Sequence, residues 1–462
     1  MSASVLWFRR DLRLGDHPAL AAAAEAAAAD GVVPLFVLDD ALLRASGPAR
    51  TAWVLRSLRA LDRDLRAHGS GLLVRHGRPE DVVPAVVAET AAGSVHISAD
   101  HAPYGRRRDE RVRVALDALP DPVPLVATGS PYAVAPGRVR TKTGTPFQVY
   151  GPFYRAWMAH GWRAPASSDP ASMPWAYSPS AGVPSEPLPE EPDIGATALP
   201  EAGEAAALAT WASFREQLAD YPEARERADL DGSSRLSPYL KIGSIHPRTL
   251  LAELGPQDDV FRRELAWREF YAAVLDAWPA SARDYFRPQL RGLPYVTGRE
   301  LRERLAAWQE GRTGYPLVDA GMRQLLAEGW MHNRVRMLVA SFLVKDLHIE
   351  WQHGARHFLR HLIDGDLASN QHNWQWVAGC GTDAAPYFRI FNPVTQSRKF
   401  DPDGVYIRRW VPELRELTGR DVHEPWRRGD GPPPGYPSPI VDHGEQRADT
   451  VAAYEELRRH PG

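Results

Sequence analysis

The sequence contains a single cysteine, Cys380, and very little lysine. One cysteine excludes a disulfide framework, a cysteine-based zinc site and an iron–sulfur cluster. Only four of the 55 basic residues are lysines, at positions 142, 241, 345 and 399, so the positive charge is almost entirely arginine, as GC-rich coding would produce. The formal net charge of −3 does not indicate a general polyanion binder, but it leaves a local basic patch open.

Two further absences narrow the class of protein. No apolar run approaches the roughly 20 residues of a membrane-spanning helix, and the first residues lack the long apolar core of a secretion signal. A hydrophobic content of 44% and a charged content of 24% are typical of globular proteins and exclude wholesale disorder. We therefore expect a cytoplasmic protein without a membrane partner.

The first 130 residues alternate short apolar runs with stretches of helical periodicity. These predict strands and helices in turn, over 5–8, 18–29, 32–38, 51–68, 72–74, 81–92, 94–98, 106–119 and 123–128. The alternation is typical of βαβ units and predicts a parallel, Rossmann-like sheet covered by helices. Ligands of such sheets bind beyond the carboxyl ends of the strands. There the chain has Arg9-Arg10-Asp11, Asp39-Asp40, His76-Gly77 and Asp100-His101, whose side chains are polar except at Gly77.

The remainder of the chain has a different character. Nine prolines between residues 165 and 200 predict a connecting segment. Helical periodicity then dominates, over 204–221, 260–278, 299–311, 318–329, 332–347 and 354–364, and ten of the 15 tryptophans lie beyond residue 205. We therefore predict an α/β plus all-α protein, with an α/β domain at 1–130, a connector at 131–204 and a helical domain at 205–462.

A serine-rich stretch precedes one of the expected helices. Ser237 followed by Pro238 predicts a helix N-cap and the first helical residue. Ser233, Ser234 and Arg235 come just before it, and hydroxyls, free backbone N–H groups and a guanidinium suit a phosphate group. A well-capped helix without a ligand explains these residues equally well, so both interpretations stand.

Other segments of the helical domain place polar side chains beside large soft ones. Asn333 and Met337 share a helix face with Arg336 beside them, which suits a planar ligand, although core packing also explains the methionine. Glu264 and Trp267 are i, i+3 neighbours on an expected helix, where a carboxylate and an indole could hydrogen-bond and stack on a nucleobase. An ordinary amphipathic helix explains the same pair.

Two further stretches bear on ligand chemistry. Residues 364–376 hold two acids, two asparagines and two tryptophans, without the spacing of a calcium or zinc site. Histidines at 353, 357 and 361 have the spacing of metal ligands on a helix, but no HExxH pattern accompanies them. We interpret them as surface or interface histidines and expect no metal.

Seven segments, in this order, resemble the DNA photolyase/cryptochrome family. They are LWFRRDLR (6–13), SRLSPYL (234–240), WREFY (267–271), TGYP (313–316), WMHNR (330–334), DGDLA (364–368) and GTDAAPYFRIFNP (381–393). The resemblance covers essentially the whole chain, and seven motifs in register are far more specific than any one of them. It is strongest to the class I photolyases that act on cyclobutane pyrimidine dimers.

The resemblance implies a fold, a cofactor and a reaction. The α/β domain would bind an antenna chromophore and the helical domain FAD. In this family the fully reduced FAD transfers an electron, under blue light, to a pyrimidine dimer flipped out of DNA; the electron splits the cyclobutane ring and returns. The implied protein is a carbon–carbon lyase whose partner is ultraviolet-damaged DNA. We expect a monomer in the bacterial cytoplasm or nucleoid, with no obligate protein partner.

The resemblance also assigns residues to FAD. Those expected to hold its phosphates and ribityl chain are Tyr221, Ser233, Ser234, Arg235, Leu236 and Ser237. Those expected around the ribityl chain and isoalloxazine are Arg268, Arg336, Asp364, Asp366 and Asn370. Arg336 and Asp364 would form an ion pair beside the ring, and Asn370 would face the flavin N5.

A second set of residues is implied for the lesion. Glu264 would hydrogen-bond the pyrimidines, and Trp267 and Trp376 would wall the pocket. Asn333 and Met337 would form its floor, where family members acting on (6-4) photoproducts carry histidines. Arginines expected at DNA phosphates are Arg334 and Arg389.

The photoreduction chain and the antenna show departures from the family pattern. Trp374 and Trp351 match the inner and middle members of the chain that photoreduces FAD, and the outermost position falls at Tyr295. Tyr104-Gly105 replaces the Asn-Glu pair of the folate binders. Residues that match positions used by deazaflavin binders are Arg50, Asp100 and Lys241, although Ala102 replaces an acid often found there. The expected antenna is 8-hydroxy-5-deazaflavin, with methenyltetrahydrofolate as the alternative.

Two alternatives to the repair enzyme remain. A cryptochrome-type blue-light photoreceptor would bind FAD without repairing DNA, but cryptochromes usually lack an asparagine at the Asn370 position. A nucleotide-binding α/β module with a helical partner domain would explain neither the tryptophans nor the cluster of acids and amides. The expected catalytic residues are Glu264, Asn370, Trp351 and Trp374.

Overall fold

The computed structural model describes residues 2–178, 182–386 and 389–459. The chain divides into two compact units. Unit 1 comprises Met1–Ile194, Pro200–Glu216 and Ser234–Pro279, and unit 2 comprises Gly195–Leu199, Gln217–Ser233 and Ala280–Gly462. These units differ from the three expected segments, because residues 200–216 and 234–279 belong to unit 1 together with the sheet. The division into functional domains therefore stays a prediction.

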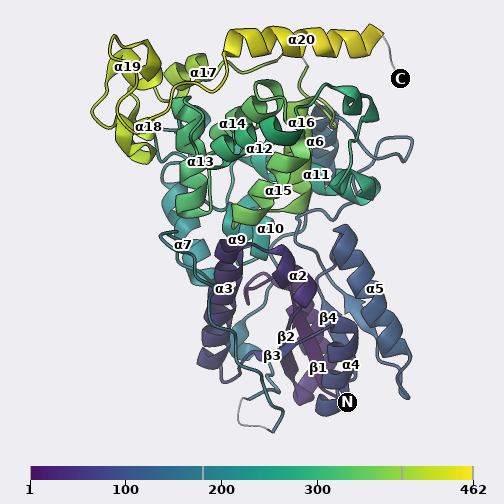
Figure 1. The fold of residues 1–462 in the computed structure, drawn as a ribbon. Coiled ribbons are helices and arrows are strands. Elements are labelled where there is room, and N and C mark those ends of the chain that lie inside the picture. The colour runs from purple at the N-terminus through teal and green to yellow at the C-terminus, as the bar shows by residue number, and fades with distance from the viewer. Residues whose placement is uncertain (1, 179–181, 387–388, 460–462) are drawn as a thin grey trace. The chain divides into compact units, whose positions relative to one another are not determined.

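Unit 1 is built on a parallel sheet with the strand order β3-β2-β1-β4-β5. Its strands are β1 Ser4–Phe8, β2 Val32–Leu38, β3 Leu73–His76, β4 Ser94–Ile97 and β5 Leu125–Ala127. Its helices are α1 Pro18–Ala27, α2 Asp40–Ala45, α3 Pro48–Ala67, α4 Pro79–Thr90, α5 Pro103–Asp117, α6 Tyr150–His160, α7 Glu204–Arg215, α9 Ser237–Ile242, α10 Pro247–Leu251 and α11 Asp259–Ala277. Figure 1 shows α3 on one side of the strands and α4 and α5 on the other.

The predicted parallel sheet is confirmed, because its strands pair in parallel. The apolar runs that predicted it are buried. In the register of β1 and β2, Val5 lies opposite Val33 and Trp7 opposite Leu35, and these side chains belong to one buried core cluster. Helices cover both faces of such a sheet, so its strands read as nearly continuous apolar runs. The predicted strand boundaries differ from the observed ones by at most two residues.

The strand order reverses direction at β1, whose neighbours are β2 and β4. The carboxyl ends of β1 and β4 therefore flank the topological switch point, where open α/β sheets bind their ligands. Arg9 and Arg10 follow β1, and Asp100 follows β4. Nη1 of Arg10 lies 4.0 Å from Oδ1 of Asp100.

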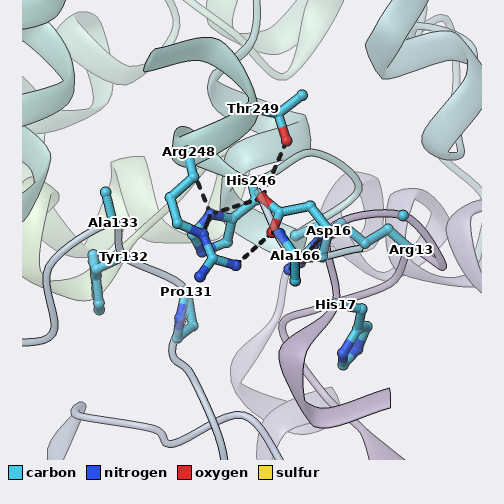
Figure 2. Close-up of polar contacts among 12 residues, drawn as sticks. Arg13, Asp16, His17, Pro131, Tyr132, Ala133, Ala166, His246, Arg248 and Thr249 are labelled. Atoms are coloured by element: carbon cyan, nitrogen blue, oxygen red, sulfur yellow. Dashed lines mark hydrogen bonds and ion pairs between the residues drawn. The ribbon is translucent and has the colours of Figure 1, made fainter. Parts of the chain in front are cut away.

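A buried polar network anchors the loop that follows β1 (Figure 2). Asp16 accepts hydrogen bonds from Nη2 of Arg248 at 2.6 Å and from the hydroxyl of Thr249 at 3.2 Å. Nε2 of His246 donates to the carbonyl of Ser130, so Nδ1 accepts from the backbone N–H of Arg248. Burial, and then the neighbouring guanidinium groups, lower the pKa of His246 well below its usual value, which keeps that nitrogen an acceptor.

The expected connector contains a regular helix. Helix α6 lies within residues 131–204 and packs against α11 in unit 1. Beyond α6, the described residues of the proline-rich stretch form a short 3-10 turn at Pro170–Ser172 and a bridge of Trp175 to Val32. Aromatic periodicity in α6 could have revealed the helix, because Phe153, Tyr154 and Trp157 are all buried.

Unit 2 is helical in the part of the chain that the structure describes. Its helices are α8 Tyr221–Ala224, α12 Gly298–Gln309, α13 Pro316–Glu328, α14 Asn333–Lys345, α15 Trp351–His361, α16 Leu367–Ala378, α17 Pro393–Phe400, α18 Val405–Trp410, α19 Gly419–His423 and α20 His443–Arg459. The core lies where α13, α14, α15 and α16 pack, and it includes the buried indoles of Trp308, Trp351 and Trp374. Among the described helices, none is both long and apolar enough to cross a membrane.

The histidine triplet on α15 is only partly as expected. His353 and His361 are half-buried, but His357 is buried and packs edge-on against Trp308. Of the two roles expected for these histidines, surface or interface, the surface role is wrong for His357. Burial, followed by the neighbouring His361 and Arg360, lowers the pKa of His357 to about 3, so this ring stays neutral.

Candidate cofactor and substrate sites

A pocket in unit 2 gathers many of the predicted site residues. It is formed by α14, the α15–α16 turn and α16. Predicted residues in its lining are Asn333, Arg336, Met337, Asp364, Asp366, Asn370 and Trp374. The predicted shared face of Asn333, Arg336 and Met337 on α14 is thus confirmed. Polar groups and apolar walls in one pocket suit a planar heteroaromatic ligand.

The expected ion pair of Arg336 and Asp364 is present. Nη1 and Nη2 of Arg336 donate to the two carboxylate oxygens of Asp364 at 3.2 and 2.8 Å. Nε of Arg336 donates to the carbonyl of Met331 at 2.8 Å, which fixes the guanidinium plane. This bidentate pair gives the pocket a rigid, charged edge.

The amide of Asn370 has a defined orientation. Nδ2 donates to the carbonyl of Ala355 at 3.0 Å and to Oε1 of Gln371 at 2.9 Å. Because a backbone carbonyl can only accept, the nitrogen must occupy this position, and Oδ1 remains as the acceptor. Asn370 is buried on α16 and lines the pocket, so it can accept a hydrogen bond from a ligand N–H there.

Trp374 and Trp351 are both buried in unit 2. The ring of Trp374 lies against Gly354, which is three residues after Trp351 on α15. A Cβ atom on Gly354 would lie only 2.1 Å from Cη2 of Trp374. Neither indole Nε1 has a hydrogen-bond partner among the described residues.

The serine-rich stretch has an unusual backbone. Arg235 has a φ of 52°, in the left-handed region that non-glycine residues rarely adopt, and the hydroxyl of Ser234 accepts from the backbone N–H of Leu236 at 3.4 Å. The predicted cap is wrong by one residue, because Leu236 is the N-cap of α9 and Ser237 is its first residue. An arginine in the left-handed region costs free energy and is a recurrent feature of binding loops.

The remaining residues expected near the phosphates are divided between the units. Tyr221 and Ser233 belong to unit 2, whereas Leu236 and Ser237 belong to unit 1. Tyr221 is buried at the start of α8, and Ser237 is exposed.

The guanidinium of Arg268 is engaged by backbone groups of unit 1. Nη1 donates to the carbonyl of Pro131 at 2.8 Å, and Nη2 donates to the carbonyl of Leu240 at 3.0 Å. The group also lies 4.6 Å from the centroid of the Tyr132 ring. Arg268 therefore ties α11 to the end of α9, whatever it contributes to a cofactor.

Glu264 and Trp267 lie on one face of α11, three residues apart. The indole of Trp267 stacks on the ring of Tyr150, with ring centroids 3.6 Å apart and an interplanar angle of 7°. Burial first, and then the charge of Glu264, raise the pKa of Tyr150. The carboxylate thus lies near the stacked pair, and Tyr150 holds Trp267 in a fixed plane.

Arg334, expected at DNA phosphates, and Trp376, expected at the lesion, both contact other parts of the protein. Arg334 donates to the carboxylate of Glu226 and lies over the ring of Phe400 at 4.8 Å. Trp376 is half-buried and packs against the helical core, outside the pocket that contains Trp374. Arg389 is exposed. The motif positions 387 and 388 lie outside the described residues.

Two of the candidate antenna residues, Asp100 and Lys241, lie beside Arg10 at the switch point of unit 1. Asp100 lies beside Arg10 and Arg108; burial alone would raise its pKa, but these guanidinium groups outweigh burial and lower it. Nε of Arg10 donates to the carbonyl of Lys241 on α9 at 3.4 Å. Arg50 lies in the first turn of α3. A charged cluster thus follows the carboxyl ends of β1 and β4.

Sequence reasoning missed several apolar residues that line the unit 2 pocket. They are Ala340, Phe358, Leu362 and Val377. Helical spacing could have found some of them, because Ala340 is three residues after Met337 and Val377 is seven after Asn370. Phe358 and Leu362 could not be found in this way, because they come from α15 and the turn after it.

The donor set of this pocket fits a flavin ring. Arg336 and the acceptor Oδ1 of Asn370 can pair with the polar edge of the ring, while Ala340, Phe358 and Val377 provide apolar walls. Within the described residues, no cluster of three or more His, Cys, Asp or Glu side chains could hold a metal ion. The fold and the pocket together define a class of protein, with an α/β unit and a helical unit that contains a pocket for a planar heteroaromatic cofactor.

The chain belongs to the DNA photolyase family. A family model described as DNA photolyase matches residues 4–172, and one described as the FAD binding domain of DNA photolyase matches residues 261–456. Deoxyribodipyrimidine photo-lyase of Streptomyces griseus is 42% identical over 97% of this chain and 98% of its own length. The Escherichia coli protein of the same name is 38% identical over 99% of this chain and 100% of its own.

Solved structures agree with this assignment. A bacterial class III photolyase from Agrobacterium tumefaciens has a TM-score of 0.89 at 35% identity, covering 99% of this chain and 98% of that one. An archaeal photolyase from Sulfolobus tokodaii, solved with two FAD molecules, has a TM-score of 0.83 at 29% identity, covering 98% of this chain and 99% of that one. The family's fold, an α/β unit and a helical FAD-binding unit, is therefore also the fold of this chain.

Proposed function

We propose that this protein repairs cyclobutane pyrimidine dimers in DNA under blue light, with FAD as its cofactor. Full-length similarity to curated proteins named deoxyribodipyrimidine photo-lyase supports the reaction. The observation that carries it is the unit 2 pocket, which combines the Arg336–Asp364 pair, the oriented amide of Asn370, and Asn333 with Met337. Reduced FAD, excited by blue light, would supply the electron that splits the ring and would take it back.

The residues of the pocket would orient the cofactor and favour its reduced state. Oδ1 of Asn370 would accept a hydrogen bond from the N5–H that only a reduced flavin carries. Arg336 would donate to the polar edge of the ring, while Asp364 keeps the guanidinium in place. Asp366 also caps α16, because its carboxylate accepts a hydrogen bond from the backbone N–H of Ser369 at 3.1 Å.

Other residues would complete the cofactor and lesion sites. Tyr221 and the loop residues 233–237 would bind the FAD phosphates through hydroxyl, backbone and guanidinium donors, with Arg268 supporting the end of α9. Glu264 would accept hydrogen bonds from the pyrimidines, and Trp267 and Trp376 would stack against them. Arg334 would reach DNA phosphates only by exchanging its bond to Glu226.

We also propose that the α/β unit holds an 8-hydroxy-5-deazaflavin antenna, contacted by Arg50, Asp100 and Lys241, rather than methenyltetrahydrofolate. The position of Gly105 supports this choice, because a Cβ atom there would lie 2.0 Å from Oδ2 of Asp100. A glutamate at this position, as in the folate binders, would displace Asp100. An absorption spectrum of protein produced in a host that makes deazaflavin tests the assignment.

The repair reaction can be tested on purified, flavin-loaded protein that has been reduced in advance. Ultraviolet-irradiated oligothymidylate is added in darkness, and half of the sample is then exposed to blue light. Splitting the cyclobutane ring restores the thymine double bond, so ultraviolet absorbance should rise only in the illuminated half. Unchanged absorbance with reduced flavin bound would contradict repair and would favour the photoreceptor alternative.

The variant Glu264→Ala should separate the lesion role from cofactor binding. We expect it to lose at least about tenfold in repair rate, equivalent to roughly 1.4 kcal/mol or more of transition-state binding. Flavin content, read from visible absorbance, should equal that of the wild type. Loss of flavin from this variant would show that Glu264 supports the cofactor and not the dimer.

A further inference from the structure

In unit 2, the buried residue Tyr285 and the half-buried residues Tyr295 and Glu350 form a group beside Trp351. The ring of Tyr285 packs edge-on against Trp351, with ring centroids 5.9 Å apart and an interplanar angle of 82°. The hydroxyl of Tyr285 donates to Oε1 of Glu350 at 2.9 Å, and its oxygen lies 3.1 Å from the hydroxyl oxygen of Tyr295. Only 7% of the surface of Tyr285 is exposed.

The two tryptophans on the pocket side of this group cannot pass on a proton when they are oxidised. An oxidised indole is a strong N–H acid, but Nε1 of Trp351 and Nε1 of Trp374 have no partner among the described residues. An oxidised indole at either position therefore stays a radical cation, and the next electron donor can reduce it. Tyr285 differs from them because its O–H points to a carboxylate that can take the proton.

We propose that Tyr285 is the terminal electron donor when light reduces the flavin, and that Glu350 is the base that accepts its proton. The proposal rests on the proposed function, since it requires flavin in the pocket lined by Trp374. The proposal assigns the outermost position of the photoreduction chain to Tyr285, whereas the family resemblance places that position at Tyr295. Tyr285 has the ring contact with Trp351, and Tyr295 reaches it only through the hydroxyl of Tyr285.

The transfer balances in atoms and electrons. In the order that the family resemblance implies, Trp374 would give one electron to the bound flavin, Trp351 would reduce the oxidised Trp374, and Tyr285 would reduce the oxidised Trp351. The O–H bond of Tyr285 breaks, a new O–H bond forms on Glu350, and a neutral phenoxyl radical remains. An added thiol then supplies a hydrogen atom to that radical. Glu350 is half-buried, so its proton can pass on to water.

Neighbouring aromatic residues fit this role less well. Trp308 touches Trp374 edge-on at 6.1 Å, but its Nε1 donates to the carbonyl of Val339, which is not a base. Tyr454 likewise donates its hydroxyl to a carbonyl, that of Ala378. Among the described aromatic residues in contact with Trp351 or Trp374, Tyr285 has a carboxylate as the acceptor of its acidic proton.

Flash spectroscopy on flavin-loaded, oxidised protein tests the proposal. After a blue flash, the wild type should show the narrow absorption band and the electron paramagnetic resonance signal of a neutral tyrosyl radical. Tyr285→Phe keeps the ring against Trp351 but lacks the O–H bond. In this variant the tyrosyl signal should vanish, and a broad tryptophan radical band should persist until the charges recombine. Steady photoreduction with thiol should slow by about tenfold or more.

Two matched variants complete the test. Tyr295→Phe removes the adjacent hydroxyl and should retain the tyrosyl signal. Glu350→Gln keeps a hydrogen-bond acceptor but removes the base, so tyrosyl formation should slow and its solvent isotope effect should change. A tyrosyl signal that survives in Tyr285→Phe, that is lost in Tyr295→Phe, or that is absent from photoreduced wild type would overturn the proposal. Dimer repair by chemically reduced wild-type protein is measured separately and tests the proposed function independently.

Discussion

At the scale of single residues, the unit 2 pocket depends on side chains that are held by backbone groups. Asn370 is oriented by the carbonyl of Ala355, and Arg336 by that of Met331. Neither contact follows from the sequence, because Ala355 lies on another helix than Asn370 and the carbonyl of Met331 is a backbone group, whose direction residue types do not specify. The family resemblance nevertheless predicted the Arg336–Asp364 pair, which the structure contains.

Gly354 is the residue that leaves space for the indole of Trp374. Gly354→Ala should destabilise the protein by roughly 1–3 kcal/mol, because overpacking outweighs the gain of about 1 kcal/mol in helix propensity. The new methyl group would lie 2.1 Å from Cη2 of Trp374. Urea unfolding measures the change, and flavin photoreduction should also slow as the ring shifts.

Gly151→Ala on α6 is the matched control. Its Cβ atom would meet only Nη1 of Arg155, at 4.0 Å. We expect this variant to be as stable as the wild type or slightly more so. Equal stability of Gly354→Ala and Gly151→Ala would contradict the close packing of Trp374 on α15.

Glu269 should make stability depend on pH. Burial raises its pKa to about 7, against the lowering effect of hydrogen bonds from Trp157 and from the N–H groups of Val134 and Ala133. The folded state therefore binds a proton more tightly than the unfolded chain, and this stabilisation is complete below the unfolded pKa. It should fall by on the order of 3 kcal/mol as pH rises from about 4.5 to 7.

The contribution of Glu269 is the difference between two urea-unfolding series. Glu269→Gln cannot ionise, so its free energy of unfolding should lack this part of the slope across the same pH range. Parallel pH profiles for wild type and variant would mean that the three donors hold Glu269 ionised at neutral pH.

At the scale of elements, the sequence predicted the sheet and most helices well. Apolar runs and helical periodicity gave the strands to within two residues and located α11, α13 and α14. The sequence did not show that residues 234–279 belong to the same unit as the sheet, because that depends on contacts such as the hydrogen bond from the N–H of Leu12 to the carbonyl of Ile242. Contacts between distant segments leave no periodicity in either one.

The end of α9 is fitted closely to the loop after β1. Gly243 has a φ of 78°, and a Cβ atom there would lie 2.1 Å from the carbonyl oxygen of Arg10. Because the obstacle is backbone, it cannot rotate away. Gly243→Ala should therefore cost at least about 3 kcal/mol, from the left-handed conformation and the clash together.

Gly161→Ala provides the comparison for this element. Gly161 ends α6 with a φ of 66°, and nothing lies within 4 Å of its added Cβ. The substitution should cost only about 1–2 kcal/mol, the conformational part alone. Thermal or urea unfolding of both variants measures the difference, and equal losses would exclude the contact of α9 with Arg10.

At the scale of the whole molecule, the chain comprises an α/β unit with a charged cluster at its switch point and a helical unit with a pocket that fits a flavin ring. The order of motifs along the chain was sufficient to predict the family, which the end-to-end similarity to photo-lyases confirms. The assignment of individual residues to lesion and antenna stays a prediction. These roles depend on ligands, and sequence patterns alone do not position them.

The central claim is a redox-neutral, light-driven repair cycle, and a single-flash experiment tests it most directly. Reduced, flavin-loaded protein is mixed in darkness with oligothymidylate carrying one dimer, receives one blue flash, and is analysed for both thymines and flavin. We predict that intact thymines appear while the flavin is recovered fully reduced, because the electron returns. Flavin oxidised without any thymine formed would contradict the account.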